Sequence, residues 1–450
     1  MLKLTRFALL FFSFLLFSKS NKALDGLYFQ QDVKYKINVT LDDRSHYLRG
    51  EEELYYKNNS PDTLRALYFH LWPNAYSNDQ TVLAKTYYND GDKRLINAIP
   101  KGLGFIDSLD FNVDGSSVKW ELLTDTPDVA RITLHQPLLP GNSLQLRTPF
   151  RIKIPDASIS RFGHTGQAYF VTQWYPKPAV YDNGGWKYFP YIDKGEFYSE
   201  FGKFDVKITL PENYVVGATG VLVDGERETA WLQSKATATV SMKEFKADSM
   251  SFPESSAEFK TLHFTQDSIH DFAWFADKRW NVLLDTVQLP KSKKVVTIQA
   301  FFTNQQAKWW MKSPEYMKRA VLYYSKWLGE YPYQYVTAAD VTDAEGSGME
   351  YPMITAIGTA SNPVALDNVL AHELGHNWLY GILGNDERHQ AWMDEGINSF
   401  YEKRYMFTAY AEDSVKMKEY FNRLGKWGKW TTTSRVDLRL KQYLKYLGDA

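Results

Sequence analysis

The pentapeptide His-Glu-Leu-Gly-His at residues 372–376 constrains the fold of this chain more than any other stretch. On a helix, His372 and His376 lie one turn apart on the same face, where both rings can bind one tetrahedral metal ion. Glu373 then lies beside the metal, where a general base for hydrolysis has to lie. Asn362 and Pro363 have the pattern of a helix cap and first-turn proline, and no glycine or proline interrupts residues 364–374. The sequence therefore predicts a metal site on a helix that begins near residue 363.

A second predicted helix offers a third ligand. A zinc site with two helical histidines needs one more protein ligand, which leaves the fourth position for water. Glu395 is separated from His376 by eighteen residues and opens a predicted helix from Asp394 to about Met406. Seven residues later, Glu402 falls on the same face, where it can hold the free N–H of a ligand histidine. The alternatives are a chance match of the pentapeptide and, for Glu402, a solvated helix glutamate.

Composition bounds the class of protein. The chain has 450 residues, of which 44% are hydrophobic and 23% charged, enough for two or three domains with cores of their own. The formal net charge of -1 provides no field that would attract nucleic acid or an anionic membrane. The sequence contains no cysteine, so the metal ligands must be His, Asp or Glu, and disulfides cannot stabilise the fold.

The first 20 residues differ in kind from the rest. A basic stretch precedes an apolar run from Phe7 to Phe17, and residues 18–20 read Ser-Lys-Ser. This arrangement predicts a secretory signal peptide over residues 1–20, and hence export to the periplasm or out of the cell. The alternative is a membrane anchor, but the run is shorter than the roughly 20 residues that span a bilayer. We therefore expect no stable membrane span after the signal is cleaved.

Short alternating stretches separated by turns dominate residues 25–285. Alternation is clear at residues 34–41, 131–135 and 204–210, and pairs such as Asp114-Gly115 predict tight turns. The pattern predicts a large, mostly antiparallel β domain. Aromatic and turn residues crowd residues 172–186, and such a stretch more often packs a long loop than lines a binding cleft.

From about residue 286 to residue 450, strand and helix patterns alternate. Strands are predicted at residues 294–302 and 353–357, with an amphipathic helix from Pro314 to about Leu328 between them. A glycine-rich loop at residues 345–352 places Glu350 beside a predicted edge strand. Such a carboxylate can meet a substrate's amino group, although a solvated glutamate on a turn is the alternative. The domain boundary is predicted near residue 285.

The H-E-x-x-H pentapeptide, the glutamate that follows it by eighteen residues, and the preceding G-M-E loop resemble the aminopeptidase N family of gluzincin zinc metallopeptidases. The resemblance extends over the β-rich region, where residues 169–173 (Tyr-Phe-Val-Thr-Gln) are similar to the family's substrate-facing loop, and continues to about residue 408. It implies an α+β multidomain protein in which an antiparallel β domain is followed by a thermolysin-like α/β catalytic domain. It also implies one Zn2+ per chain, held by His372, His376 and Glu395, with Glu373 polarising the metal's water.

The resemblance also implies a substrate and the residues that bind it. Glu350 would bind the free amino terminus of a peptide, and Gly348, Met349 and Gln173 would lie along the substrate. The implied activity is that of an exported aminopeptidase, which hydrolyses amino-terminal residues from peptides.

Some positions depart from the family pattern. Ser347 and Tyr351 replace a glycine and the asparagine of the usual G-x-M-E-N loop, and Tyr175 stands where a second amine-binding residue is common. These differences leave a thermolysin-like endopeptidase open as an alternative.

The family's oxyanion-stabilising tyrosine usually lies roughly sixty residues beyond the third ligand. This sequence ends 55 residues after Glu395, with Tyr443 and Tyr446 as nearby candidates, and the family's carboxy-terminal helical domain is missing. We therefore expect a truncated chain, and an inactive fragment that only binds zinc and peptide is the second alternative. The sequence does not indicate an oligomeric state.

Overall fold

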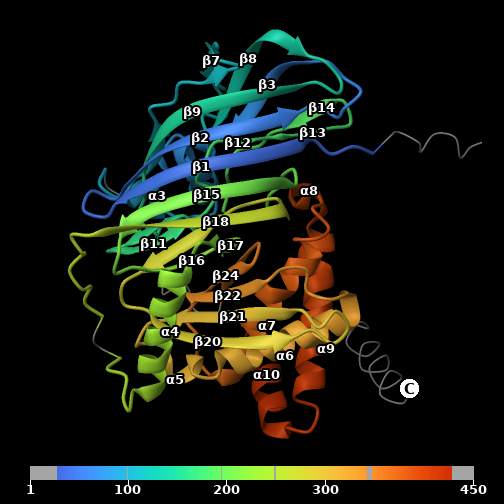
Figure 1. Cartoon of the computed structure of the whole chain (residues 1–450). Coiled ribbons are helices and arrows are strands. Elements are labelled where there is room, and N and C mark those ends of the chain that lie inside the picture. Colours follow the sequence, from blue (N-terminus) through green and yellow to red (C-terminus); the bar gives the residue numbers. More distant parts are fainter. Residues whose placement is uncertain (1–27, 99, 194, 248–249, 342–346, 428–450) are drawn as a thin grey trace, which may run out of the picture.

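The computed structural model describes residues 28–98, 100–193, 195–247, 250–341 and 347–427. The predicted signal peptide at residues 1–20 and the candidate tyrosines Tyr443 and Tyr446 lie outside these ranges. Within them, an upper part made largely of strands stands above a smaller sheet flanked by helices (Figure 1). None of the helices in the described ranges combines the length and the apolar character needed to cross a lipid bilayer.

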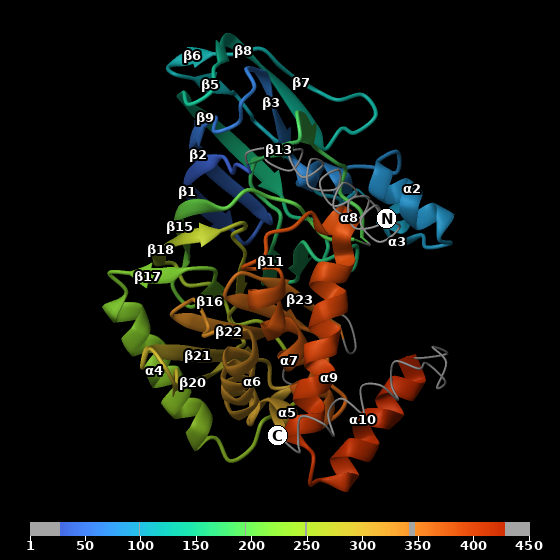
Figure 2. The same ribbon diagram turned by 90° about the vertical axis from the view of Figure 1, so that its right-hand side faces the viewer.

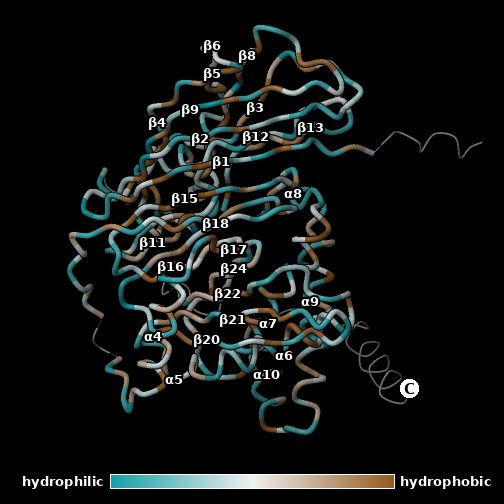
Figure 3. The backbone as a smooth tube through the Cα atoms, viewed as in Figure 1, coloured by the Kyte–Doolittle hydropathy of each residue, from teal (hydrophilic) through white to brown (hydrophobic). Residues whose placement is uncertain are grey.

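A long twisted sheet forms the core of the upper part. In the described residues it has nine strands, in the order β17-β18-β15-β1-β2-β9-β5-β6, with β4 also paired to β9. Neighbouring strands are antiparallel except β1 and β15, so the mostly antiparallel domain predicted from the alternation is confirmed. Buried and exposed residues alternate strictly along β1, and Figure 3 shows hydrophobic and hydrophilic residues interleaved along these strands. The strands are β1 (Asp32–Asp42), β2 (Tyr47–Lys57), β4 (Phe105–Asp107), β5 (Asn112–Val113), β6 (Ser116–Ser117), β9 (Ser143–Lys153), β15 (Gly202–Pro211), β17 (Val221–Val223) and β18 (Phe259–Ile269).

Smaller sheets complete the upper part. The described residues form two four-stranded sheets, ordered β10-β11-β19-β16 and β12-β3-β8-β7, and the hairpin β13-β14. The aromatic stretch predicted at residues 172–186 passes between them, and it packs the interior, since Trp174 and Tyr175 are fully buried. These strands are β3 (Leu64–His70), β7 (Trp120–Leu122), β8 (Val129–Leu138), β10 (Gly163–Thr165), β11 (Ala168–Val171), β12 (Lys177–Pro178), β13 (Val180–Asp182), β14 (Gly185–Lys187), β16 (Val215–Ala218) and β19 (Trp274–Asp277).

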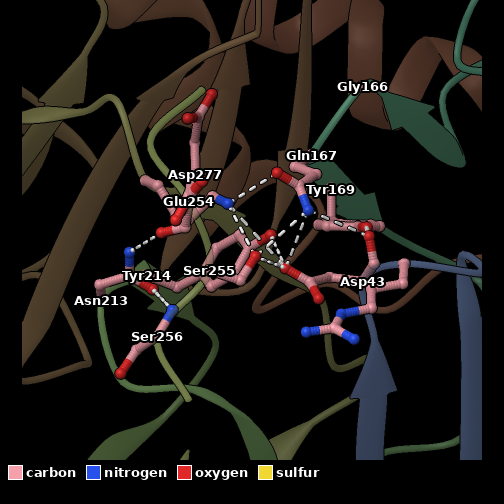
Figure 4. A network of polar contacts seen from close by, with 12 residues as sticks. Asp43, Gly166, Gln167, Tyr169, Asn213, Tyr214, Glu254, Ser255, Ser256 and Asp277 are labelled. Atoms are coloured by element: carbon pink, nitrogen blue, oxygen red, sulfur yellow. Dashed lines mark hydrogen bonds and ion pairs between the residues drawn. The ribbon is translucent and has the colours of Figure 1, made fainter. Parts of the chain in front are cut away.

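A buried polar network joins the β1–β2 turn to the sheet of β11 and β16 (Figure 4). The carboxylate of Asp43 accepts hydrogen bonds from Tyr214 Oη at 2.7 Å and Gln167 Nε2 at 3.1 Å, and also from Ser255 Oγ. Lys278 Nζ donates to Gln167 Oε1 at 2.6 Å. These hydrogen bonds satisfy the buried oxygens of Asp43, so the network fixes how the two sheets meet.

The lower part is built on a mixed five-stranded sheet, in the order β20-β21-β22-β24-β23 within the described residues. The strands predicted at residues 294–302 and 353–357 are confirmed as β21 and β24, and β23 lies at the edge, antiparallel to β24. The domain boundary near residue 285 stays a prediction. The strands are β20 (Asn281–Gln288), β21 (Val295–Phe302), β22 (Tyr335–Asp340), β23 (Gly348–Tyr351) and β24 (Ile354–Ile357).

Helices cover this sheet and connect it to the upper part. Both predicted helices before residue 380 are confirmed, as α6 and α7, and α6 packs against α7 beneath the sheet. α8 and α9 form a column that rises from beside α7 to the strands of the upper part (Figure 2). The helices are η1 (Trp72–Tyr76), α2 (Val82–Asn89), α3 (Arg94–Asn97), α4 (Glu226–Ser241), α5 (Ala307–Trp310), α6 (Ser313–Leu328), α7 (Pro363–Leu379), α8 (Glu387–Ala391), the π-helical η2 (Trp392–Gly396), α9 (Ile397–Ala409) and α10 (Ser414–Trp427).

α4 departs from the expectation that residues 25–285 contain only short strands and turns. Its 16 residues include strong helix formers, but its buried residues are only Glu228, Leu232, Ala236 and Thr239, of which two are apolar. It packs against β20, at the side of the sheet away from α9 (Figures 1 and 2). Packing on the lower sheet therefore stabilises a helix whose own periodic signal is weak.

Candidate metal centre

α7 holds the two histidines in a rigid setting. The Asn362 side chain caps the helix by accepting from the Ala365 amide at 2.8 Å, and Pro363 occupies its first turn. Nearly all of α7 is buried between the sheet, α6 and α9. Gly375 permits the approach of α9, because a Cβ there would meet Asn398 Oδ1 at 2.1 Å. The Asn398 side chain in turn donates to the His372 carbonyl at 2.8 Å, which ties the two helices together at the site.

Three ligand atoms converge at the open side of α7. His372 Nε2 lies 3.3 Å from His376 Nε2 and 3.2 Å from Glu395 Oε2, and His376 Nε2 lies 3.9 Å from that oxygen. Ligands at zinc's usual distances of about 2.0–2.1 Å are about 3.3 Å apart in a tetrahedral site. The two nitrogens and the oxygen are also a donor set that zinc accepts. The structure thus brings together the three predicted ligands in a geometry that fits a zinc ion.

Carboxylates hold both ligand histidines from behind. Glu402 Oε2 lies 3.2 Å from His372 Nδ1, and Asp394 Oδ1 lies 2.5 Å from His376 Nδ1. Each contact orients its ring so that Nε2 faces the site, and it makes the imidazole a stronger ligand. Glu402 is itself positioned by a hydrogen bond from the Asn368 amide.

Asp394 contacts His376, but the sequence alone indicates it only as the start of a predicted helix. Its place next to Glu395 is a signal that it could face the second histidine. The predicted helix also begins differently from the expectation, because Trp392–Gly396 is a π-helical turn ahead of α9. The wider turn is what lets Glu395 reach the histidines while Asp394, one residue earlier, passes behind His376.

Glu373 and Glu350 lie together on the inner side of the site. One oxygen of each and one nitrogen of His376 lie within 4.8 Å of one another. Both glutamates are 5% exposed, and each has one carboxylate oxygen with no hydrogen-bond partner among the described residues. Gly348 lies against Glu373, since a Cβ there would be 2.2 Å from Glu373 Oε1. Buried oxygens without partners point to a ligand that supplies donors.

The electrostatics of the site separate its carboxyl groups. Burial raises the pKa of Glu373 to about 7, against the opposing charges of His372 and His376. Burial also raises the pKa of Glu350, and the charge of Glu196 adds to that effect. Burial acts in the same direction on Glu395, but its hydrogen bond to His372 and the charges of both histidines outweigh it and lower its pKa to about 2. Glu395 is therefore an anion at neutral pH, while Glu373 can accept and release a proton there.

The remaining predicted residues line β23 or lie behind it. Met349 is partly exposed on the face of β23 opposite Glu350. Gln173 is 3% exposed, adopts a left-handed backbone with φ of 47°, and accepts a weak hydrogen bond from Tyr351 Oη at 3.4 Å. Tyr175 does not face the site, because its hydroxyl donates to Asp271 at 2.8 Å in the interior of the upper part. The structure thus groups Gly348, Met349 and Gln173 around β23 and leaves Tyr175 out.

Comparisons with known proteins agree with this architecture. No family model matches the sequence. Among solved structures, an M1 zinc metallopeptidase from Deinococcus radiodurans matches with a TM-score of 0.56 and 17% identity, over 88% of this chain and 76% of that one. A glutamate-to-alanine mutant from the same organism, bound to a Tyr-Ser-Ala substrate, matches with a TM-score of 0.55 and 17% identity, over 88% and 75%. A two-domain M1 zinc metallopeptidase mutant bound to L-arginine matches with a TM-score of 0.55 and 16% identity, over 88% and 75%. This chain shares the fold of M1 zinc metallopeptidases.

Proposed function

We propose that this protein is a zinc-dependent aminopeptidase that removes amino-terminal residues from peptides. One observation carries the proposal: three ligand atoms of a zinc site converge within 3.9 Å of one another, with two further buried glutamates beside them. The shared fold supports it, since the matched neighbours are zinc metallopeptidases, one of them bound to a peptide substrate.

His372, His376 and Glu395 would hold the zinc ion. When bound, zinc lowers the pKa of a coordinated water to about 7 and polarises the scissile carbonyl. Glu373 acts as the general base, because its carboxyl has a pKa of about 7 and one oxygen free to take a proton. Glu373 then returns that proton to the leaving amine, as a carboxyl with this pKa can do at neutral pH.

Glu350 determines where the chain is cut. Its buried, unpartnered oxygen is a site for the ammonium group of a peptide's first residue, which would relieve the cost of burying the carboxylate. One oxygen of Glu350 lies within 4.8 Å of a ring nitrogen of His376, so an ammonium group held by Glu350 would place the first peptide bond beside the proposed metal ligands. Cleavage after the first residue follows from that spacing, which favours an aminopeptidase over an endopeptidase.

The test compares peptides with free and acetylated amino termini. The wild-type chain with zinc should hydrolyse the free peptide at its first bond and leave the acetylated one intact, as mass spectrometry of the products would show. Glu373→Gln should abolish turnover, and Glu244→Gln, at an exposed position outside the site, should not. Internal cleavage of acetylated peptides would establish an endopeptidase instead. Zinc binding without any cleavage would establish the inactive fragment.

We also propose that the protein is exported, on the strength of residues 1–20. Mass spectrometry of the protein recovered from cells should find a mature amino terminus near residue 21. Recovery of residues 1–20 on the mature protein would contradict export by this route.

A further inference from the structure

A cavity of about 340 Å³ lies where the upper and lower parts meet, on the face of the lower sheet opposite α6. We call it the junction cavity. α4 runs down from β17 along the side of the lower sheet and forms one of its walls, and strands of the upper part form another (Figures 1 and 2). Its floor belongs to β20, β21 and β22 and consists of Leu284, Thr286, Thr297, Gln299 and Tyr335.

The floor is the part of this sheet face that α4 leaves uncovered. Val282 of β20 and Phe301 of β21 are partners in register, and both are buried in one cluster with Leu232 of α4. The next two rows of partners on the same face, which form the floor, are only half-buried or exposed. Burial therefore falls off along the sheet from the row under α4, and the described residues place no element over the floor.

The walls of the junction cavity are mostly apolar and come from both parts of the molecule. The upper part supplies Leu222, Leu262 and Phe264, and α4 supplies Leu232. Leu222 is only half-buried, as is Leu284 on the floor. An apolar molecule in the cavity would take this surface out of contact with water, which is the main source of affinity in apolar sites.

The lining offers no unpaired charge. Its two charged residues are Glu228 and Asp285, and each forms an ion pair with a lysine outside the lining. Lys260 Nζ lies 2.7 Å from the Glu228 carboxylate, and Lys318 Nζ lies 2.6 Å from that of Asp285. A charged ligand would have to break one of these pairs or stay unbalanced, whereas the side chain of Gln233 can meet a hydroxyl or amide group.

The size of the junction cavity favours a small molecule over a protein partner. Small-molecule sites occupy about 300–1,000 Å³ and are common where two parts of a protein meet. A helix with its side chains is about 10–12 Å across, so it would not enter a space of 340 Å³. A partner strand could not pair here either, because the floor presents the face of a sheet and not an edge.

We propose that the junction cavity binds an uncharged, mainly apolar small molecule, of the size of a medium-chain alcohol or a two-ring aromatic compound. The inference goes beyond the proposed peptidase function and does not depend on it. Because the cavity has walls from both parts, the bound molecule contacts both at once and opposes movement of one against the other.

The experiment titrates the full-length protein with N-phenylnaphthylamine, an uncharged two-ring dye whose emission rises in apolar surroundings. The dye should bind saturably, and decanol should displace it at a concentration about tenfold lower than decanoate or decylammonium, which carry opposite charges. Thr297→Trp places a large ring over the middle of the floor, between its neighbours Thr286 and Tyr335. This variant should weaken dye binding by about tenfold or more, because it fills the cavity.

Val295→Trp is the matched control. Val295 precedes Thr297 by two residues, so it lies on the same face of β21, but it is 55% exposed and does not line the cavity. This variant should bind the dye as the wild type does. If Thr297→Trp does not fold, Gln233→Trp fills the cavity from an exposed position on α4.

The proposal fails if the dye does not bind saturably, or if a folded cavity-filling variant binds it as tightly as the wild type. Displacement by decanoate or decylammonium at the same concentration as decanol would also overturn it, because the site would then accept charge. Dye binding requires neither zinc nor turnover. A negative result would therefore leave the proposed peptidase function standing, and a protein without peptidase activity could still confirm the junction cavity.

Discussion

Replacing Gly348 by alanine should disable Glu373 without touching a metal ligand. A Cβ at this position would lie 2.2 Å from Glu373 Oε1 and 2.4 Å from its Cδ. Because Glu373 is only 5% exposed, its carboxyl must move by roughly 1 Å inside a packed site to relieve the overlap. A misplacement of about 1 Å costs on the order of 10²-fold in rate. That factor corresponds to about 2.7 kcal/mol of transition-state stabilisation.

The assay measures kcat/KM with a free dipeptide, zinc content by elemental analysis and the free energy of unfolding by urea denaturation. We expect the loss in kcat, with zinc content unchanged, since the ligand atoms stay in place. The free energy of unfolding should change by at most about 1 kcal/mol, because the atoms that must move lie at the end of a side chain and not in the backbone. Gly185→Ala is the control, since a Cβ there meets no atom within 4 Å. If the folded Gly348→Ala protein had the kcat of the wild type, Glu373 could not be a base that is held tightly in one position.

Three further outcomes follow from the buried carboxyls and histidines. Glu402→Gln and Asp394→Asn should each weaken zinc retention by about 10- to 100-fold in a chelator competition, because each removes an anion that holds a histidine ring of the proposed site. Zinc retention equal to that of the wild type would show that these carboxylates do not support the histidines. The carboxylates around His372 outweigh the effect of its burial and raise its pKa. Zinc retention should therefore fall as the pH falls through that raised pKa, because a protonated ring cannot bind the metal. Zinc retention that does not change with pH would contradict this prediction. Burial raises the pKa of Glu200 from 4.5 to about 8, so between these pH values the folded state holds a proton that the unfolded state releases. The free energy of unfolding should therefore fall as the pH rises from about 4.5 to about 8. Glu200→Gln should remove up to about 5 kcal/mol of that dependence in urea titrations at the two ends of this range, and an unchanged pH profile would exclude Glu200 as its source.

Local signals were enough to predict the helix of the histidines. Asn362 and Pro363 start α7 as expected, and the i, i+4 spacing of the histidines required a helix for both to meet one metal. Alternation likewise predicted β1 and β15, because half-buried strands carry a period of two in their own residues. These features depend on residues that are close together in the sequence, which is why they could be predicted from it.

Features that depend on distant segments were not predictable in the same way. α4 is stabilised by packing on β20 rather than by a strong apolar stripe. Asp394 reaches His376 only because a π turn widens the backbone just before α9, and no residue pattern signals that turn. A cavity of about 360 Å³ beside β23 is lined by residues that only the folded chain brings together, among them Arg94, Phe170, Phe275 and Met349.

Glu395, the proposed third ligand, is supported separately from the two histidines. The histidines are fixed by α7 within the core of the lower part, whereas Glu395 follows a segment, residues 380–391, that packs on the upper part. In that segment, Arg388 lies 4.5 Å from the Phe189 ring and donates to the Pro190 carbonyl, and Gly384 lies against the Phe201 ring. Glu387, which begins α8, is 1% exposed.

These contacts link the position of Glu395, the proposed third ligand, to the β-rich part. Glu395 is an anion next to two histidines. Its position depends on the segment that precedes it, residues 380–391, and that segment is anchored to the upper part. In the proposed enzyme, zinc retention therefore depends on how the two parts meet, and a shift between them would alter it.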